Sequence, residues 1–267
     1  MEPSSSSQTS ELPTSPLIAK GLHQAFRDNG YLKFEGVVDK AQLTELTTAI
    51  RREFEETKLA GRLFEGGGTL SGHLNCFPGA GSRFVYEALE AAGIIALVRS
   101  LSAVPLRAPN IGCNLNLPGS SAQNDHVDGY ASQPFLVVNV AAVDTDLDNG
   151  AMEILAETHH SDAKYWQILL DRPKRKRVCL KQGDVVIRTS TLWHRGMPNF
   201  TALPRPMLAF TWEDGGSSLA DPYQVHDGHI TFLPNRYQTD WASRLRERAF
   251  VTLPAAGTAY RAVRSLF

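Results

Sequence analysis

The sequence has few cysteines, no long apolar run and almost no net charge, and each shortage narrows the possible functions. The three cysteines are far apart and form no CxxC pair, which excludes a zinc ribbon and a thioredoxin motif. No stretch approaches the roughly 18 consecutive apolar residues of a membrane span. The formal net charge is −1, so no overall field favours nucleic acid or an anionic membrane. We therefore expect neither nucleic acid nor a membrane as a partner.

The beginning of the chain also lacks the features of a secretory signal. Residues 1–16 are rich in Ser and Pro and contain no Lys or Arg, so they have neither the charged start nor the apolar run of a signal peptide. We expect them to form a disordered tail, and we expect the protein to be cytoplasmic. The remaining residues, 17–267, are few enough for a single domain.

Hydrophobic spacing changes along the chain. Apolar residues recur every three to four positions in the first hundred residues, which predicts amphipathic helices. Between about residues 106 and 212, short apolar runs alternate with turn signals, which indicates the strands of a sandwich or barrel. The predicted fold class is α+β, a jelly roll (double-stranded β-helix) flanked by N-terminal helices. We expect helices over 17–29, 39–59, 82–101, 162–170 and 236–248, a strand over 31–34, a loop at 66–68 and a solvated turn at the basic run 174–177.

One short motif, His126-Val-Asp128, suggests a metal site. In an extended strand, residues i and i+2 point to the same face, so both side chains would reach one ion. A third ligand must come from elsewhere, and His194 is the leading candidate. Two imidazoles and one carboxylate on one side of an ion are the donor set typical of non-haem iron(II) oxygenases, because they leave positions open for further ligands.

Arg205 follows His194 by eleven residues. An arginine is always charged and binds carboxylates through two parallel hydrogen bonds. It would suit the far carboxylate of a dicarboxylate co-substrate whose other end chelates the metal. Taken alone, however, Arg205 would be expected as an exposed arginine at a strand edge.

Five blocks in order make the sequence similar to a known family. It resembles the phytanoyl-CoA dioxygenase family of iron(II)- and 2-oxoglutarate-dependent oxygenases from about residue 17 to residue 212. The matching blocks are Phe26-Arg-Asp-Asn-Gly-Tyr-Leu32, Gln123-Asn-Asp-His-Val-Asp-Gly-Tyr130, Asp148-Asn-Gly-Ala-Met-Glu153, Gly183-Asp-Val-Val-Ile187 and Leu192-Trp-His194 with Asn199 and Arg205 beyond it.

The resemblance implies roles for these residues. Iron(II) would be bound by His126, Asp128 and His194, with 2-oxoglutarate and O₂ as co-substrates. Arg205 would bind the 5-carboxylate of 2-oxoglutarate. Family members often carry a polar residue before the HxD motif that contacts the 1-carboxylate end, and here the candidates are Asn114 and Asn116.

The loop after the asparagine–glycine turn departs from the family pattern, and the substrate stays open. Where the family often has Pro-Gly-Ser/Thr-His, this chain has Ala156-Glu-Thr-His159, so that loop is expected to differ in shape. His73 and Asn75 alternate on a predicted strand and, with Tyr130, are candidates for contact with substrate. The polar loop 221–229 is interpreted as surface.

Three other functions fit the sequence less well. An iron(II)- and 2-oxoglutarate-dependent halogenase has Gly or Ala in place of the carboxylate ligand, so Asp128 argues against it. A cupin-like metal protein that does not use 2-oxoglutarate would have no need of Arg205. A non-catalytic binding protein is disfavoured because all four of the key side chains are present.

Overall fold

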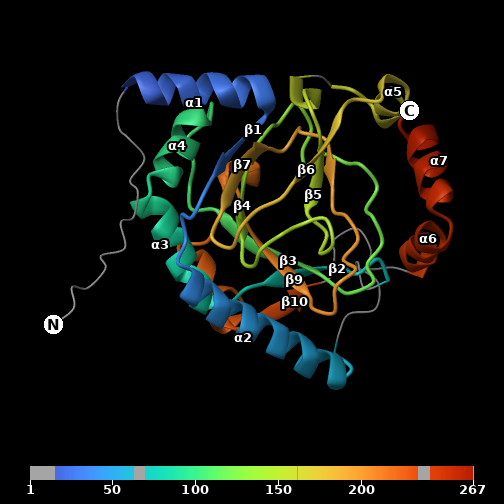
Figure 1. Ribbon diagram of the computed structural model, residues 1–267, viewed down its shortest axis with the longest axis horizontal. Coiled ribbons are helices and arrows are strands. Elements are labelled where there is room, and N and C mark those ends of the chain that lie inside the picture. Colours follow the sequence, from blue (N-terminus) through green and yellow to red (C-terminus); the bar gives the residue numbers. More distant parts are fainter. Residues whose placement is uncertain (1–15, 63–69, 161, 234–240, 267) are drawn as a thin grey trace.

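The computed structural model describes residues 16–62, 70–160, 162–233 and 241–266. Its strands form two antiparallel sheets (Figure 1). The major sheet has the order β1 (Tyr31–Phe34), β7 (Val185–Thr189), β4 (Leu136–Ala141), β9 (Arg205–Thr211), β3 (Asn110–Asn116), β2 (His73–Phe77) and β10 (Thr231–Leu233). The minor sheet consists of β6 (Arg175–Val178), β5 (Met152–Leu155) and β8 (His194–Arg195).

Four N-terminal helices cover the outer face of the major sheet (Figure 1). They are α1 (Pro16–Asn29), α2 (Lys40–Leu59), α3 (Arg83–Ala91) and α4 (Ile94–Leu101). The Asp39 side chain caps α2 by accepting the Gln42 N–H at 2.9 Å, which satisfies one otherwise unpaired donor of the first turn. Apolar side chains of these helices pack on outward-facing sheet residues such as Leu115 and Phe210.

A second apolar cluster fills the space between the two sheets. It joins Val186 and Met207 of the major sheet to Ile154 and Val178 of the minor sheet. The inner face of the major sheet is therefore the face that meets the minor sheet. Because directly opposed residues of antiparallel strands share a face, the pairing of His73 with Asn116 and of Asn116 with Arg205 places these three side chains in one row on the inner face.

The C-terminal part adds α5 (Tyr165–Asp171), α6 (Trp241–Thr252) and α7 (Pro254–Arg264). Short 3-10 turns complete the described chain: η1 (Ala80–Ser82), η2 (Thr158–His160), η3 (Glu213–Gly215) and η4 (Pro222–Gly228). None of the helices in the described ranges combines the length and apolar character needed to cross a membrane.

Several expected elements have different limits. The helix predicted over 82–101 is two helices, because Gly93 adopts a left-handed conformation with φ 75° between them. The basic run 174–177 is not a turn, since Arg175–Val178 forms β6, but Lys174, Arg175 and Lys176 are exposed as expected. Residues 241–248 of the helix predicted over 236–248 belong to α6, residues 236–240 lie outside the described residues, and α7 was not expected. The predicted loop at 66–68 and residues 1–15 of the predicted tail lie outside the described residues, and Pro16 already belongs to α1.

Candidate metal centre

The structure brings the three predicted metal ligands together between the sheets. One donor atom from each of His126, Asp128 and His194 lies within 4.8 Å of the other two. Each imidazole Nε2 is 3.7 Å from Asp128 Oδ1. The donor set of two imidazole nitrogens and one carboxylate oxygen fits a divalent first-row metal, iron(II) among them.

The backbone conformation that brings these side chains together differs from the extended strand that was predicted. The HxD segment is not a continuous strand. Instead His126 forms an isolated antiparallel bridge with His194, with reciprocal N–H···O bonds of 3.0 and 2.9 Å. The Asp128 N–H donates to the Ser190 carbonyl at 2.9 Å. The bridge places both imidazoles side by side, with ring centroids 4.5 Å apart.

Hydrogen bonds orient both imidazoles for metal binding. Nδ1 of His126 donates to the Asn124 carbonyl, and Nδ1 of His194 donates to the Leu192 carbonyl, each at 2.9 Å. A carbonyl can only accept, so the proton resides on Nδ1 and the Nε2 lone pair faces the other donors. Burial lowers the pKa of His126 and lowers that of His194 to about 3, which keeps both rings neutral near pH 7.

Asp128 is held as a carboxylate. Burial alone would raise its pKa, but the charge and the hydrogen bond of the Arg188 guanidinium lower the pKa well below the usual range. Arg188 Nη2 lies 2.6 Å from Asp128 Oδ2. The Asp128 side chain keeps 29% of its surface accessible while that of Arg188 keeps 6%, so the centre has an open side for other ligands.

Arg205 is buried, not exposed at an edge. It lies at the start of β9, between β4 and β3, and is 5% accessible. Its Nη2 donates to the Gly150 carbonyl at 2.9 Å, and its Nε lies 3.4 Å from the Asn149 carbonyl. Burial lowers the pKa of Arg205 to about 10. In the described part of the chain no carboxylate pairs with this cation, so the site can accept an anionic group.

The asparagine–glycine turn shapes the cradle around Arg205. Gly150 has φ 85°, a conformation that residues with a side chain rarely adopt. A Cβ on Gly150 would collide with the Asn116 side chain and with the carbonyls of Met197 and Pro198. Only glycine therefore lets the turn approach both Asn116 and Arg205.

The other candidate residues on β2 and β3 differ in exposure. Asn116 is fully buried, and its Nδ2 donates to the Met197 carbonyl at 2.9 Å, while its Oδ1 has no hydrogen-bond partner among the described residues. Asn114 is partly buried, with Nδ2 3.4 Å from the Leu74 carbonyl. His73 is buried, and its Nε2 donates to the Ser121 carbonyl at 2.7 Å. Asn75, opposite Asn114, is exposed.

Tyr130 and the loop 221–229 do not contribute to the group of residues around the candidate metal centre. The Tyr130 side chain is 82% accessible. The loop forms η4, which packs beside η1. It is tied to α3 by a 2.6 Å contact between Arg83 and Asp221, and Arg83 lies over the Tyr223 ring.

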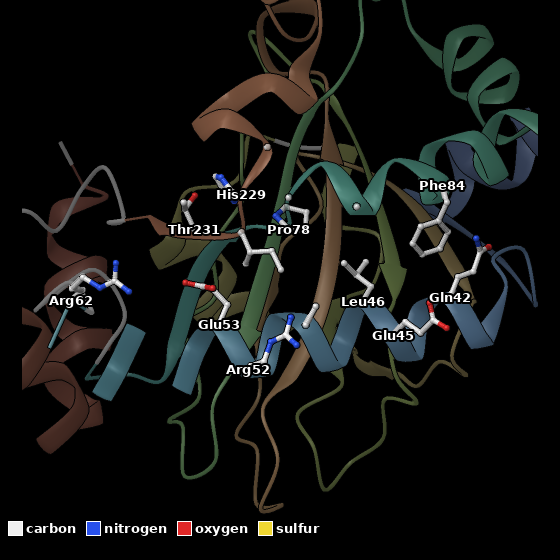
Figure 2. Close-up of a pocket in the computed structure, with 15 residues that line it drawn as sticks. Gln42, Glu45, Leu46, Arg52, Glu53, Arg62, Pro78, Phe84, His229 and Thr231 are labelled. Carbon is white, nitrogen blue, oxygen red and sulfur yellow. The ribbon is translucent and has the colours of Figure 1, made fainter. Parts of the chain in front are cut away.

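An open groove elsewhere is not the candidate site. Figure 2 shows it between α2 and the segment after β2. None of the three predicted metal ligands lines it. Its walls include Gln42, Glu45, Arg52, Pro78, Phe84 and His229.

An ion-pair network connects residues adjacent in sequence to two of the candidate metal ligands. Arg175 donates to both carboxylate oxygens of Asp125, at 2.9 and 2.8 Å, and to Glu153 at 2.8 Å. Arg195 also contacts Glu153, at 2.6 Å. Asp125 precedes His126 and Arg195 follows His194, so the network joins the two ligand-bearing segments to β5 and β6.

We expect Arg175→Met to destabilise the fold by about 2 kcal/mol. Removing one partner of a buried ion pair costs ~3–5 kcal/mol, and the loss is smaller here because Arg175 is 38% exposed and Arg195 remains. Urea unfolding monitored by circular dichroism measures the change. The matched control is Lys181→Met, which breaks an exposed pair with Asp144 and should hardly move the midpoint. Equal midpoints for the two variants would contradict the structural role of the network.

Comparisons with solved structures identify the fold. The epimerase SnoN in complex with Fe3+, alpha ketoglutarate and nogalamycin RO superposes with a TM-score of 0.60 at 21% identity, over 74% of this chain and 84% of that chain. EctD from S. alaskensis with bound Fe gives 0.56 at 18% identity, over 76% and 79%. AviO1 from Streptomyces viridochromogenes gives 0.55 at 17% identity, over 74% and 96%. These likenesses confirm the expected α+β jelly roll.

A family model gives the more specific result. The model described as phytanoyl-CoA dioxygenase (PhyH) matches residues 26–207, which is more than half of the 267-residue chain. The match contains the HxD motif, the distal histidine and Arg205. The chain therefore belongs to the phytanoyl-CoA dioxygenase family, as its sequence motifs predicted.

Proposed function

We propose that the protein is an iron(II)- and 2-oxoglutarate-dependent dioxygenase that hydroxylates a small-molecule metabolite and releases succinate and CO₂. The observation that carries this proposal is the combination of a three-donor centre with a buried arginine that lacks a carboxylate partner among the described residues. A metal protein that did not use a dicarboxylate would gain nothing from burying Arg205, because an unpaired buried charge is costly.

In this proposal, His126, Asp128 and His194 hold the metal on one side. The bound iron supplies the oxygen chemistry, in which O₂ and 2-oxoglutarate together oxidise the substrate. The protein contributes geometry: the bridged histidines present neutral Nε2 atoms, and Asp128 supplies one negative charge. Arg205 binds the 5-carboxylate of 2-oxoglutarate and so orients the opposite end of that molecule toward the metal.

The same fold serves several outcomes in other proteins. SnoN is described as an epimerase and SnoK as a carbocyclase. Hydroxylation is the outcome proposed here, with desaturation and oxidative cyclisation as alternatives that product analysis would distinguish. The candidate substrate contacts favour a polar small molecule, and His73 is the one of the three that is buried, since Asn75 and Tyr130 are exposed. His73 is suited to accept a hydrogen bond, because its Nδ1 is buried with no partner in the part of the chain that the structure describes, and burial lowers the pKa of His73 to about 4.

Asn116 is proposed to contact the 1-carboxylate end of 2-oxoglutarate, with Asn114 as the second candidate. Asn116→Ala should raise the 2-oxoglutarate dissociation constant about tenfold or more, the cost of one hydrogen bond to a charged group. An anaerobic titration of the iron(II)-loaded protein measures this constant. Asn75→Ala is the control, since Asn75 lies on the neighbouring strand but is exposed. Unchanged binding in both Asn114→Ala and Asn116→Ala would exclude the assignment.

Succinate release tests the overall function. The purified protein should form succinate only when iron(II), 2-oxoglutarate and O₂ are all present, and a correct substrate should stimulate the release. A panel of candidate metabolites then identifies the substrate class. Absence of succinate under all conditions, in a protein that still binds metal, would favour the non-catalytic alternative.

A further inference from the structure

Arg188 is a buried cation that the proposed reaction does not yet use. It lies on the inner face of β7, opposite Val137 of β4 and Tyr31 of β1. Its Nη2 donates to Asp128 Oδ2 at 2.6 Å, and its Nε donates to Asn139 Oδ1 at 3.1 Å. Its Nη1 is buried with no hydrogen-bond partner among the described residues. Burying a charged arginine in a sheet costs free energy. The hydrogen bond from Arg188 to a candidate metal ligand therefore indicates a specific role.

The two oxygens of Asp128 have different neighbours. Oδ1 is the oxygen that lies 3.7 Å from both imidazole Nε2 atoms, and Oδ2 is the oxygen bound by Arg188. One carboxylate oxygen thus faces the metal centre, and the other accepts a hydrogen bond from the guanidinium. Asn139, 9% accessible, in turn supports the guanidinium.

We propose that Arg188 is a positioning residue that holds Asp128 as a one-oxygen metal ligand. This inference rests on the proposed function. A free carboxylate can bind a metal through one or both oxygens, and a second oxygen would fill a coordination position that 2-oxoglutarate needs for chelation. By binding Oδ2, Arg188 keeps that position open. Its positive charge also offsets part of the negative charge that Asp128 and the dianionic co-substrate bring to the centre.

This role differs from that of Arg205. Arg205 contacts backbone carbonyls at the Asn149–Gly150 turn and not Asp128. Loss of either arginine should weaken 2-oxoglutarate binding, but only loss of Arg188 should change how the metal is coordinated before 2-oxoglutarate is added. The Arg205 variant is therefore the matched control for the Arg188 variant.

The test uses cobalt(II) as a spectroscopic substitute for iron(II) in the full-length protein. The visible ligand-field spectrum is recorded without O₂, first without and then with 2-oxoglutarate, for the wild type, Arg188→Met, Arg188→Lys, Asn139→Ala and Arg205→Ala. We expect Arg188→Met to alter the spectrum of the cobalt protein alone and to weaken cobalt(II) binding about 10- to 100-fold, the usual effect on metal affinity of losing a partner of a metal ligand. The 2-oxoglutarate dissociation constant should rise as well. Asn139→Ala and Arg188→Lys should show smaller changes in the same direction.

The outcomes distinguish positioning of Asp128 from direct contact with the co-substrate. An Arg188→Met spectrum identical to that of the wild type would overturn the proposal, even if 2-oxoglutarate bound less tightly, because Arg188 would then contact only the co-substrate. A changed spectrum in Arg205→Ala without 2-oxoglutarate would overturn it as well. If Arg188→Met does not fold, Asn139→Ala decides by the same criterion. The proposed function would be refuted instead if the wild type did not bind cobalt(II), or if His194→Ala bound cobalt(II) as tightly as the wild type.

Discussion

His194→Ala should lose tight binding of iron(II) and all measurable turnover. The variant keeps only two of the three donors. Loss of a residue that merely hydrogen-bonds to a metal ligand lowers metal affinity or activity about 10- to 100-fold. Loss of a ligand itself should therefore reduce the metal affinity further. His126→Ala and Asp128→Ala should behave in the same way, because the three donors are arranged around one point.

The measurement is a metal-binding titration by calorimetry combined with succinate release. The control is His23→Ala, which removes an exposed imidazole bonded to Ser100 and should leave metal binding intact. Full activity in any one of the three ligand variants would refute the assignment of these residues as metal ligands.

Arg205→Ala should leave metal binding intact but raise the 2-oxoglutarate concentration needed by roughly 10² to 10³-fold or more. The variant leaves the 5-carboxylate in a buried cradle without its cation, and removing one partner of a buried ion pair costs ~3–5 kcal/mol. The cradle is 5% accessible at Arg205, so water cannot easily replace the guanidinium.

Lysine should rescue the Arg205 variant only in part, since an ammonium cannot form the two parallel hydrogen bonds of a guanidinium. A 2-oxo acid without the distal carboxylate should bind the alanine variant about as well as 2-oxoglutarate does. Titration of the iron(II)-loaded proteins without O₂, followed by the metal-to-ligand absorption band, gives both dissociation constants. Equal constants for the wild type and Arg205→Ala would show that another residue holds the co-substrate.

The sequence was informative where the signal is local. The helical spacing predicted a helix over 39–59, which is α2, and the turn signals predicted the β-rich region between about 106 and 212. The HxD spacing identified two residues whose side chains do converge. The expected continuous strand was wrong, because His126 is aligned by its bridge to His194. That bridge joins segments far apart in the sequence, and no local pattern encodes it.

Long-range pairing and burial of charged residues were the main features that could not be predicted. The run 174–177 is solvent-exposed at Lys174, Arg175 and Lys176, as expected, but it forms a strand and not a turn. Here Arg175 is neutralised by Asp125 and Glu153, which lie far away in sequence. The burial of Arg205 similarly depends on the strand order β4-β9-β3. For Arg188 a local signal existed: a single arginine follows the apolar run Val185–Ile187, which in a buried strand indicates a specific partner.

A crystal structure with iron(II) and 2-oxoglutarate, obtained without O₂ and using anomalous scattering at the iron edge, tests the central claim most directly. We predict one iron ion bound by Nε2 of His126, Oδ1 of Asp128 and Nε2 of His194, with the 5-carboxylate of 2-oxoglutarate paired to Arg205. An anomalous peak away from these three residues, or a 5-carboxylate held by another side chain, would contradict this prediction.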